Sequence, residues 1–310
     1  MGIGNVLFSK NIKYILNTHK GTMNKPYDFI DIAIEEAKVS LREGNSGFGA
    51  VIVKDNNVIS KAHDTDTTLK DPTAHAELSA IRQASGILNG NFEGCILIST
   101  HEPCPMCSTA IVWSGIKHVA FGYSIVEALN QGRKRINLTC EELFKRAGVE
   151  IEVTRGVKRN ECSLLYNSQV RSSIKQLRKA DSEKLKNQAE ELKIKRLKWF
   201  ETQQIQNDTK NPLESAYNLL LLKLGISSTE APIVVREERK LVFHSKNFCP
   251  TLEACKILDI DTRVVCKALN EEPTQALLQQ LDPRIEFTRN YDALRPKKDY
   301  CEEMIILNEK

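Results

Sequence analysis

The sequence has no long hydrophobic run and no unusual surplus of glycine or proline. Its longest apolar runs, such as Leu219–Leu222, hold four residues, far fewer than the ~20 that cross a bilayer as a helix. With 15 glycines and 10 prolines among 310 residues, collagen-like repeats and low-complexity scaffolds are excluded. We therefore expect a globular protein with no membrane partner, long enough for about two domains of roughly 150 residues each.

Cysteine is too sparse for a secreted scaffold held together by disulfides. Nine cysteines in 310 residues make no dense framework, and no secretory apolar segment precedes them. An odd number of cysteines fits reduced thiols or metal ligands better than a complete set of disulfides. We expect a cytoplasmic protein.

The sequence also lacks a large excess of charge of either sign, because the net charge of the whole chain is only +4. Residues 1–25 carry +4, residues 26–168 carry −3, residues 169–210 carry +5 and residues 211–310 carry −2. The two bulky segments are therefore mildly acidic and offer little general attraction for a polyanion. The basic segment 169–210 either contacts RNA phosphates or is a solvated spacer helix, and we favour the spacer.

Changes of pattern along the chain predict four segments. Residues 1–25 form an N-terminal extension that is disordered or precedes the true start at Met23. An α/β domain covers residues 26–168, a long charged connector helix covers 169–211, and a smaller α/β domain covers 212–310. Strands that alternate with helices indicate a mixed or parallel sheet covered on both faces.

Two short stretches, PTAHAE at 72–77 and EPCPMC at 102–107, carry the chemistry. Cys104 and Cys107 stand three apart at the start of an expected helix, so both sulfurs share one face, and the helix N-terminus favours thiolates. With the His75 imidazole they make three ligands, which leaves one tetrahedral position open as in catalytic zinc sites. Glu77 would move protons between water and substrate. Because it stands two residues after His75, either the helix start deviates or Glu77 reaches across the pocket.

A closed structural zinc site is the alternative interpretation of the same residues. It would need a fourth ligand from Cys95, Cys140, His101 or His118. None of these has metal-ligand spacing to the cysteine pair, so we favour the open site.

His-x-Glu followed by Pro-Cys-x-x-Cys is the signature of zinc-dependent nucleobase deaminases, and here the chain resembles the cytidine/deoxycytidylate deaminase superfamily. PTAHAELSAIR and EPCPMCSTAIVW look like its purine branch, the guanine deaminases and tRNA adenosine deaminases. The resemblance covers about residues 28–167. It implies a three-layer α/β/α fold, Zn²⁺ on His75, Cys104 and Cys107, Glu77 as the proton shuttle, and a homodimer.

The resemblance also implies an aminohydrolase that turns a small amino-purine or related heterocycle into its oxo form and releases ammonia. A guanine-like base or nucleoside is the first choice of substrate. Adenosine-to-inosine deamination in tRNA, with the connector or the N-terminal tail binding the RNA, is the alternative. A non-catalytic ligand-binding sensor on the same fold is the second alternative.

Four further residues are predicted near the substrate. His63 stands where purine deaminases of this group usually carry a base-contacting asparagine, and Ala76 lies between the motif residues His75 and Glu77. Phe48 and Trp113 either border the base pocket by ring stacking or pack in the core, and core packing is favoured.

The last hundred residues carry a second, looser pattern. FCPTLEACKIL, then Cys266, DPRIEFTRN and YCEEMIIL, resemble the amino-thiazoline-carboxylate hydrolase-like domains over residues 212–310. That resemblance would place Cys249, Cys266 and Cys301 near a ligand site, with Cys301 as a nucleophile, and we assign no reaction. Without it, free cysteines that behave as small hydrophobic residues are the default interpretation.

Overall fold

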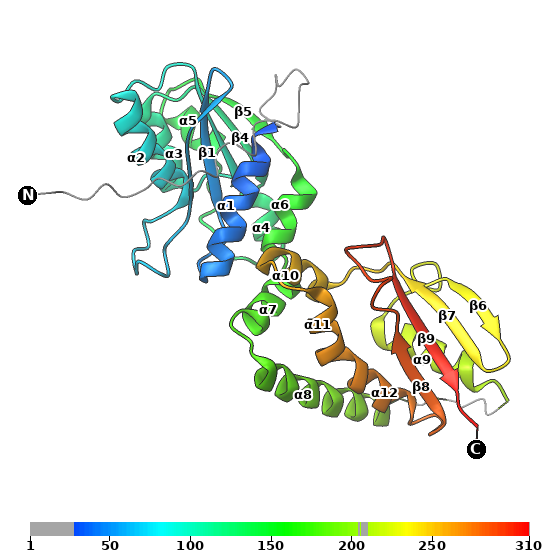
Figure 1. The fold of residues 1–310 in the computed structure, drawn as a ribbon. Coiled ribbons are helices and arrows are strands. Elements are labelled where there is room, and N and C mark those ends of the chain that lie inside the picture. Colours follow the sequence, from blue (N-terminus) through cyan, green and yellow to red (C-terminus); the bar gives the residue numbers. More distant parts are fainter. Residues whose placement is uncertain (1–27, 204, 206–209, 310) are drawn as a thin grey trace, which may run out of the picture. The chain divides into compact units, whose positions relative to one another are not determined.

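The computed structural model describes residues 28–203, 205 and 210–309, so the predicted N-terminal extension 1–25 lies outside the described residues. The described chain forms two compact units (Figure 1). The first unit comprises residues 28–34, 49–62 and 76–158, and the second comprises residues 35–48, 63–75 and 159–309. The predicted domain boundaries at 168 and 211 stay predictions.

Five strands form the larger sheet in the order β2-β1-β3-β4-β5. Their bounds are β1 Gly49–Lys54, β2 Asn57–His63, β3 Cys95–His101, β4 His118–Tyr123 and β5 Glu152–Arg155. β3 is antiparallel to β1, with Ser99 opposite Ala50, whereas β4 and β5 run parallel to β3. Asp55 and Asn56 join β1 to β2 with positive φ angles at both positions, which is the backbone that a two-residue hairpin turn favours.

The centre of this sheet is covered on both faces. β1, β3 and β4 are buried along nearly their whole length instead of alternating between buried and exposed positions, as expected for strands with both faces covered. The helices in this part of the chain are α1 Ile30–Glu43, α2 Ala76–Leu88, α3 Pro105–Ser114, α4 Ile125–Asn130 and α5 Cys140–Arg146. α2 lies against β1 and β3, and α3 lies against α2 and α5. The predicted α/β architecture is confirmed.

A smaller α/β region, also as predicted, occupies the C-terminal part of the chain. Its helices are α6 Arg159–Tyr166, α7 Ser168–Leu177, α8 Ser182–Glu201, α9 Pro212–Leu224, α10 Pro250–Leu258, α11 Thr262–Cys266, a π-helix Lys267–Glu271 and α12 Glu272–Leu278. Its strands are β6 Ile233–Glu237, β7 Lys240–Ser245, β8 Ile285–Arg289 and β9 Cys301–Leu307, all antiparallel in the order β6-β7-β9-β8. α9 lies against β9 and α12 lies against β8.

The connector is two helices instead of the single long helix predicted. The chain leaves α7 after Leu177, and Lys179 adopts a positive φ of 64°. Asp181 then starts α8 by accepting a hydrogen bond from the backbone N–H of Lys184 at 2.8 Å, a side-chain cap that favours a new helix start. The connector is also not a free spacer, because α7 packs on α10 and α8 packs on α12 and the π-helix. Trp199 packs against the hydrophobic core of the smaller sheet.

The sequence also predicted no membrane partner. In the part of the chain that the structure describes, none of the helices combines the length and the apolar character that crossing a bilayer requires.

Candidate active site

The predicted metal ligands stand at the N-terminal ends of two helices. His75 directly precedes α2, Cys104 is the N-cap residue of α3, and Cys107 lies in the first turn of α3. Their ligand atoms all lie within 4.8 Å of one another and could hold one metal ion. Pro105 occupies the first position of α3, where its fixed φ suits the helix and its missing N–H is not needed.

The start of α2 differs from the prediction. Asp71 followed by Pro72 is typical of an N-cap residue and the first helical position, so the sequence predicts a helix that opens at Asp71. In the structure, α2 begins at Ala76. The Asp71 carboxylate instead accepts hydrogen bonds from the N–H and the hydroxyl of Thr73, at 2.8 and 2.7 Å, a local turn that competes with helix formation. His75 is therefore outside α2 and Glu77 is inside it. Of the two alternatives for this pair, the structure has the deviating helix start.

Glu77 is a buried carboxylate beside the ligand cluster. It lies in the first turn of α2 and is 4% exposed. The Ser99 hydroxyl of β3 donates a hydrogen bond to Oε1 at 3.1 Å, and the Sγ of Cys107 lies 3.4 Å from Oε2. A buried carboxylate needs a compensating charge or proton nearby, and a cation on the Cys107 sulfur would supply the charge.

The donor set fits zinc. One imidazole and two thiolates are ligands that zinc prefers, and three protein ligands leave a position for water or substrate. The neighbouring Cys104 thiol, burial and the Glu77 carboxylate all raise the pKa of the Cys107 thiol. This thiol therefore ionises only beside a cation, which removes the proton of a coordinating thiol outright.

No fourth ligand joins the cluster among the residues that the structure describes. His101 is buried, its Nδ1 donates to the carbonyl oxygen of Glu102 at 2.9 Å, and burial lowers its pKa to about 3. The Nε2 of His118 contacts a threonine hydroxyl, and Cys95 and Cys140 are buried free thiols. The cluster thus keeps the three-ligand composition of a catalytic site.

Sequence reasoning missed Glu102, which precedes the loop that carries Cys104. Its buried carboxylate accepts hydrogen bonds from the backbone N–H groups of Ile125 and Cys140, at 2.8 and 2.9 Å. These are the first residues of α4 and α5, and a carboxylate is favourable at a helix N-terminus. Glu102 therefore ties two helices to the ligand loop. Its signals in the sequence are its place as the first residue of the EPCPMC stretch and its position directly after a buried strand, and neither assigned it a role.

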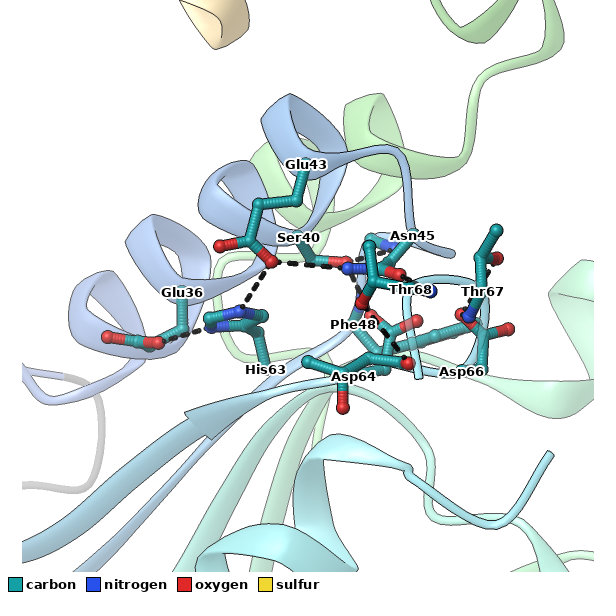
Figure 2. Close-up of polar contacts among 12 residues, drawn as sticks. Glu36, Ser40, Glu43, Asn45, Phe48, His63, Asp64, Asp66, Thr67 and Thr68 are labelled. Carbon is teal, nitrogen blue, oxygen red and sulfur yellow. Dashed lines mark hydrogen bonds and ion pairs between the residues drawn. The ribbon is translucent and has the colours of Figure 1, made fainter. Parts of the chain in front are cut away.

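His63 lies between two carboxylates of α1 (Figure 2). Its Nδ1 contacts Glu36 Oε2 at 2.8 Å and its Nε2 contacts Glu43 Oε2 at 3.2 Å. The hydrogen bond with Glu36 is the main cause that raises the pKa of His63, although partial burial opposes it. Both ring nitrogens are engaged, so a purine would have to displace one carboxylate. The role of His63 in substrate binding stays a prediction.

Asp64, the next residue, holds the loop that carries Phe48. Its fully buried carboxylate accepts hydrogen bonds from the Ser40 hydroxyl at 2.6 Å and from the N–H groups of Ser46 and Phe48 at 2.8 and 2.7 Å (Figure 2). The Phe48 ring stacks on Tyr166, with centroids 5.3 Å apart. Phe48 is therefore partly used in packing, and its contact with a substrate stays a prediction.

The other two predicted substrate residues differ in burial. Ala76 is fully buried at the first position of α2. Trp113 is 85% exposed, so the favoured prediction that it packs in the core is wrong. It lies with Met106, Thr109 and Ala110 on one face of α3, at the i, i+3, i+4, i+7 spacing, and all four are exposed or half-exposed. This face of α3 is left uncovered by the described chain.

The three predicted cysteines of the C-terminal part lie within electrostatic reach of one another. Burial is the main cause that raises the pKa of Cys266, and Cys249 and Cys301 add to it. Cys249 caps α10 by accepting from the N–H of Leu252 at 3.4 Å, and burial raises its pKa too. The Nε of Arg295 donates to the sulfur of Cys301 at 3.3 Å. Cys249 and Cys266 are thus neutral thiols at pH 7 and not activated nucleophiles.

Comparison with known proteins places the motifs in a family. Residues 23–123 match the cytidine and deoxycytidylate deaminase zinc-binding region. A tRNA-specific adenosine deaminase of Bacillus subtilis is 35% identical over 159 residues, which are 51% of this chain and 94% of that protein. A tRNA-specific adenosine deaminase of Aquifex aeolicus is 50% identical over 100 residues, 32% of this chain and 66% of that protein. The guanine deaminase of B. subtilis is 42% identical over 106 residues, 34% of this chain and 68% of that protein.

Among solved structures, one from a study of tRNA:A34 deaminases aligns with 27% identity and a TM-score of 0.39, over 44% of this chain and 98% of that one. The matched zinc-binding region contains the cluster of His75, Cys104 and Cys107, and the predicted Zn²⁺ cofactor is thereby confirmed. The two tRNA-specific adenosine deaminases and the guanine deaminase fit the predicted purine branch. The match to the B. subtilis tRNA-specific adenosine deaminase spans 94% of that protein. The chain therefore belongs to the cytidine and deoxycytidylate deaminase family.

Proposed function

We propose that this chain is a zinc-dependent aminohydrolase that converts an amino-purine to its oxo form and releases ammonia. The observation that carries the proposal is buried Glu77, with one carboxylate oxygen 3.4 Å from the sulfur of Cys107. A zinc ion held by His75, Cys104 and Cys107 supplies a Lewis acid that makes water a nucleophile at neutral pH.

Glu77 would carry the protons of the reaction. Its carboxylate takes a proton from the attacking water and gives it to a ring nitrogen, and the second proton follows to the departing amine. Water thus adds to the amino-bearing carbon, the C–N bond breaks and ammonia leaves. The hydrogen bond from Ser99 holds the carboxylate in place and favours its ionised form.

A free guanine-like base is the substrate we propose first. The segment 26–168 carries −3 and offers no general attraction for polyphosphate. The carboxylates of Glu36 and Glu43 beside His63 add local negative charge. The guanine deaminase of B. subtilis among the relatives supports the same choice.

Adenosine in tRNA is the second candidate substrate. A groove of about 530 Å³ in the second unit is lined in part by Arg171, Lys175 and Arg178, and such a basic groove suits a phosphate backbone. Two of the relatives described above are tRNA-specific adenosine deaminases.

The test incubates the zinc-loaded full chain with guanine, other amino-purines and their nucleosides, and separately with tRNA. Ammonia release from a free base supports the first candidate, and inosine in the tRNA with no release from free bases supports the second. Binding of a heterocycle without turnover on any of these substrates would contradict the aminohydrolase and favour the sensor alternative.

A further inference from the structure

Two buried arginines lie within electrostatic reach of each other in the second unit. Arg196 of α8 is 9% exposed, and the side chain of Arg289, at the end of β8, is 10% exposed. Burial and the charge of Arg289 lower the pKa of Arg196 to about 10. Two guanidinium groups in such a place are costly unless anions compensate them.

Among the described residues, only one carboxylate forms a hydrogen bond with either of these two arginines. Glu303 of β9 accepts a hydrogen bond from the Nε of Arg289 at 2.9 Å and is itself buried. Arg196 donates instead to two neutral acceptors, the hydroxyl of Thr274 at 2.5 Å and the amide oxygen of Asn270 at 3.3 Å. One buried positive charge is therefore left without a bonded anion.

Each arginine also has an unused donor. The Nε of Arg196 and the Nη1 of Arg289 are buried and meet no hydrogen-bond acceptor within the described ranges of the chain. A buried N–H group without an acceptor costs free energy, and the cost is larger for a charged group. A ligand oxyanion would accept hydrogen bonds from such donors and supply the missing negative charge, since guanidinium groups bind carboxylate and phosphate oxygens well.

One acceptor of Arg196 lies in a π-helix. Asn270 belongs to the π-helix Lys267–Glu271, a rare form that is frequent at functional sites. The two charged ends of this π-helix, Lys267 and Glu271, have opposite signs, so they do not compensate the arginine pair. Cys266, one residue before the π-helix, is close enough to Arg289 for the guanidinium to oppose the rise of its pKa.

We propose that the second unit binds a small molecule through an oxyanion group, a carboxylate or a phosphate, which is held by Arg196 and Arg289. The proposal is independent of the deaminase reaction, because none of its residues belongs to the zinc cluster or contacts Glu77 in the bonds described. It gives the C-terminal part of the chain a ligand of stated chemistry.

The test is calorimetric titration of the zinc-loaded full chain with sodium phosphate and with sodium acetate, at ionic strength matched with sodium chloride. We expect saturable binding of at least one anion, and Arg196→Met weakens it at least about tenfold. Arg263→Met is the matched control, because Arg263 is 40% exposed and is paired with Asp261. Preference for phosphate or for acetate identifies the group. No saturable binding of either anion, or equal binding by Arg196→Met, overturns the proposal.

Thermal unfolding gives a second, independent readout. Arg196→Met removes an uncompensated buried charge and strands no carboxylate, so without added anion the melting temperature stays equal or rises. Phosphate or acetate then raises the melting temperature of the unmodified chain and not that of the variant. A variant that melts lower in the absence of anion would assign Arg196 a purely structural role and overturn the proposal.

Discussion

Ser99 positions Glu77 through a single 3.1 Å hydrogen bond. Loss of this donor makes protonation of the carboxylate easier. Ser99→Ala therefore lowers kcat about tenfold and moves the acid limb of the pH–rate profile to higher pH. The measurement is kcat for ammonia release between pH 5 and pH 9. Ser163→Ala removes a hydroxyl that donates to the carbonyl oxygen of Asn160 in its own helix and should leave the profile unchanged. An unmoved profile in Ser99→Ala would contradict the positioning role.

His63 makes stability depend on pH through its contact with Glu36. Because this contact raises the pKa of His63, protonated His63 stabilises the folded chain. The contribution is complete below the unfolded pKa of about 6.5 and is lost as the pH rises through the higher folded-state value. Glu36→Gln should therefore lower the free energy of unfolding by ~1 kcal/mol at pH 5.5 and by less at pH 9.

Urea unfolding of Glu36→Gln at both pH values checks this prediction. Glu35→Gln is the control, since Glu35 is exposed and pairs with Lys38, so its effect should be the same at both pH values. If Glu36→Gln lowered the free energy of unfolding equally at pH 5.5 and pH 9, the contact with Glu36 would not stabilise the protonated form of His63, which would contradict this prediction.

The metal ligands could be predicted from the sequence and the environment of His63 could not. A three-residue spacing of Cys104 and Cys107 at a helix start dictates a shared face whatever the rest of the chain does. The carboxylates on His63 come from Glu36 and Glu43, which are 27 and 20 residues away. That pairing depends on how the helix lies beside the strand, and no local pattern encodes it.

Glu102 connects three elements, so its replacement should affect the site through the fold. Glu102→Gln places an NH₂ group against one of two backbone N–H donors and removes the charge that favours two helix N-termini. We expect a loss of about 3 kcal/mol in the free energy of unfolding, together with faster loss of zinc to a chelator.

Glu142→Gln is the matched control for Glu102→Gln, because Glu142 forms an exposed pair with Arg146 one turn further along α5. It should cost less than ~0.5 kcal/mol. The measurements are urea unfolding and the rate of zinc release. Equal, small effects of both variants would contradict the role of Glu102 as the tie between the ligand loop and the two helices.

Two helices end at glycine residues, as the sequence pattern indicates. Two other helices start at positions that differ from the prediction, because an aspartate side chain bonds the backbone there. Gly115 and Gly225 close α3 and α9 with positive φ angles of 80° and 64°, which glycine adopts without strain. Asp71 and Asp181 instead bond nearby backbone N–H groups. The bond of Asp71 delays the start of α2, and the bond of Asp181 begins α8. Such local side-chain bonds are difficult to predict from the amino-acid composition of a segment.

The uncovered face of α3 predicts how copies of the chain associate. Its apolar residues include Trp113, which is 85% exposed, and a helix that is apolar on both sides is normally buried on both. We expect a homodimer in which this face is covered, and Trp113→Glu should shift it to monomer. Light scattering after size-exclusion chromatography measures the mass. Leu222→Glu, at an exposed leucine of α9, should leave the dimer intact, and a monomeric unmodified chain would contradict the interface.

The charge count of the connector does not tell which of its charged side chains are exposed and which are buried. The count of +5 for residues 169–210 predicts either an RNA contact or a solvated helix. Arg196, one of these charges, is buried inside the second unit and bonds Thr274. The two α/β regions could be predicted because strand and helix patterns are local. The insertion of one connector side chain into the second unit depends on tertiary packing.

Glu77→Gln is the variant that tests the deaminase assignment most directly, with zinc content and ammonia release measured on the same sample. The assignment predicts one zinc per chain, as in the unmodified protein, and a fall in kcat of about 1,000-fold. Glu93→Gln, at an exposed position, should retain both zinc and activity. Ammonia release by Glu77→Gln at a rate near that of the unmodified protein would contradict the account.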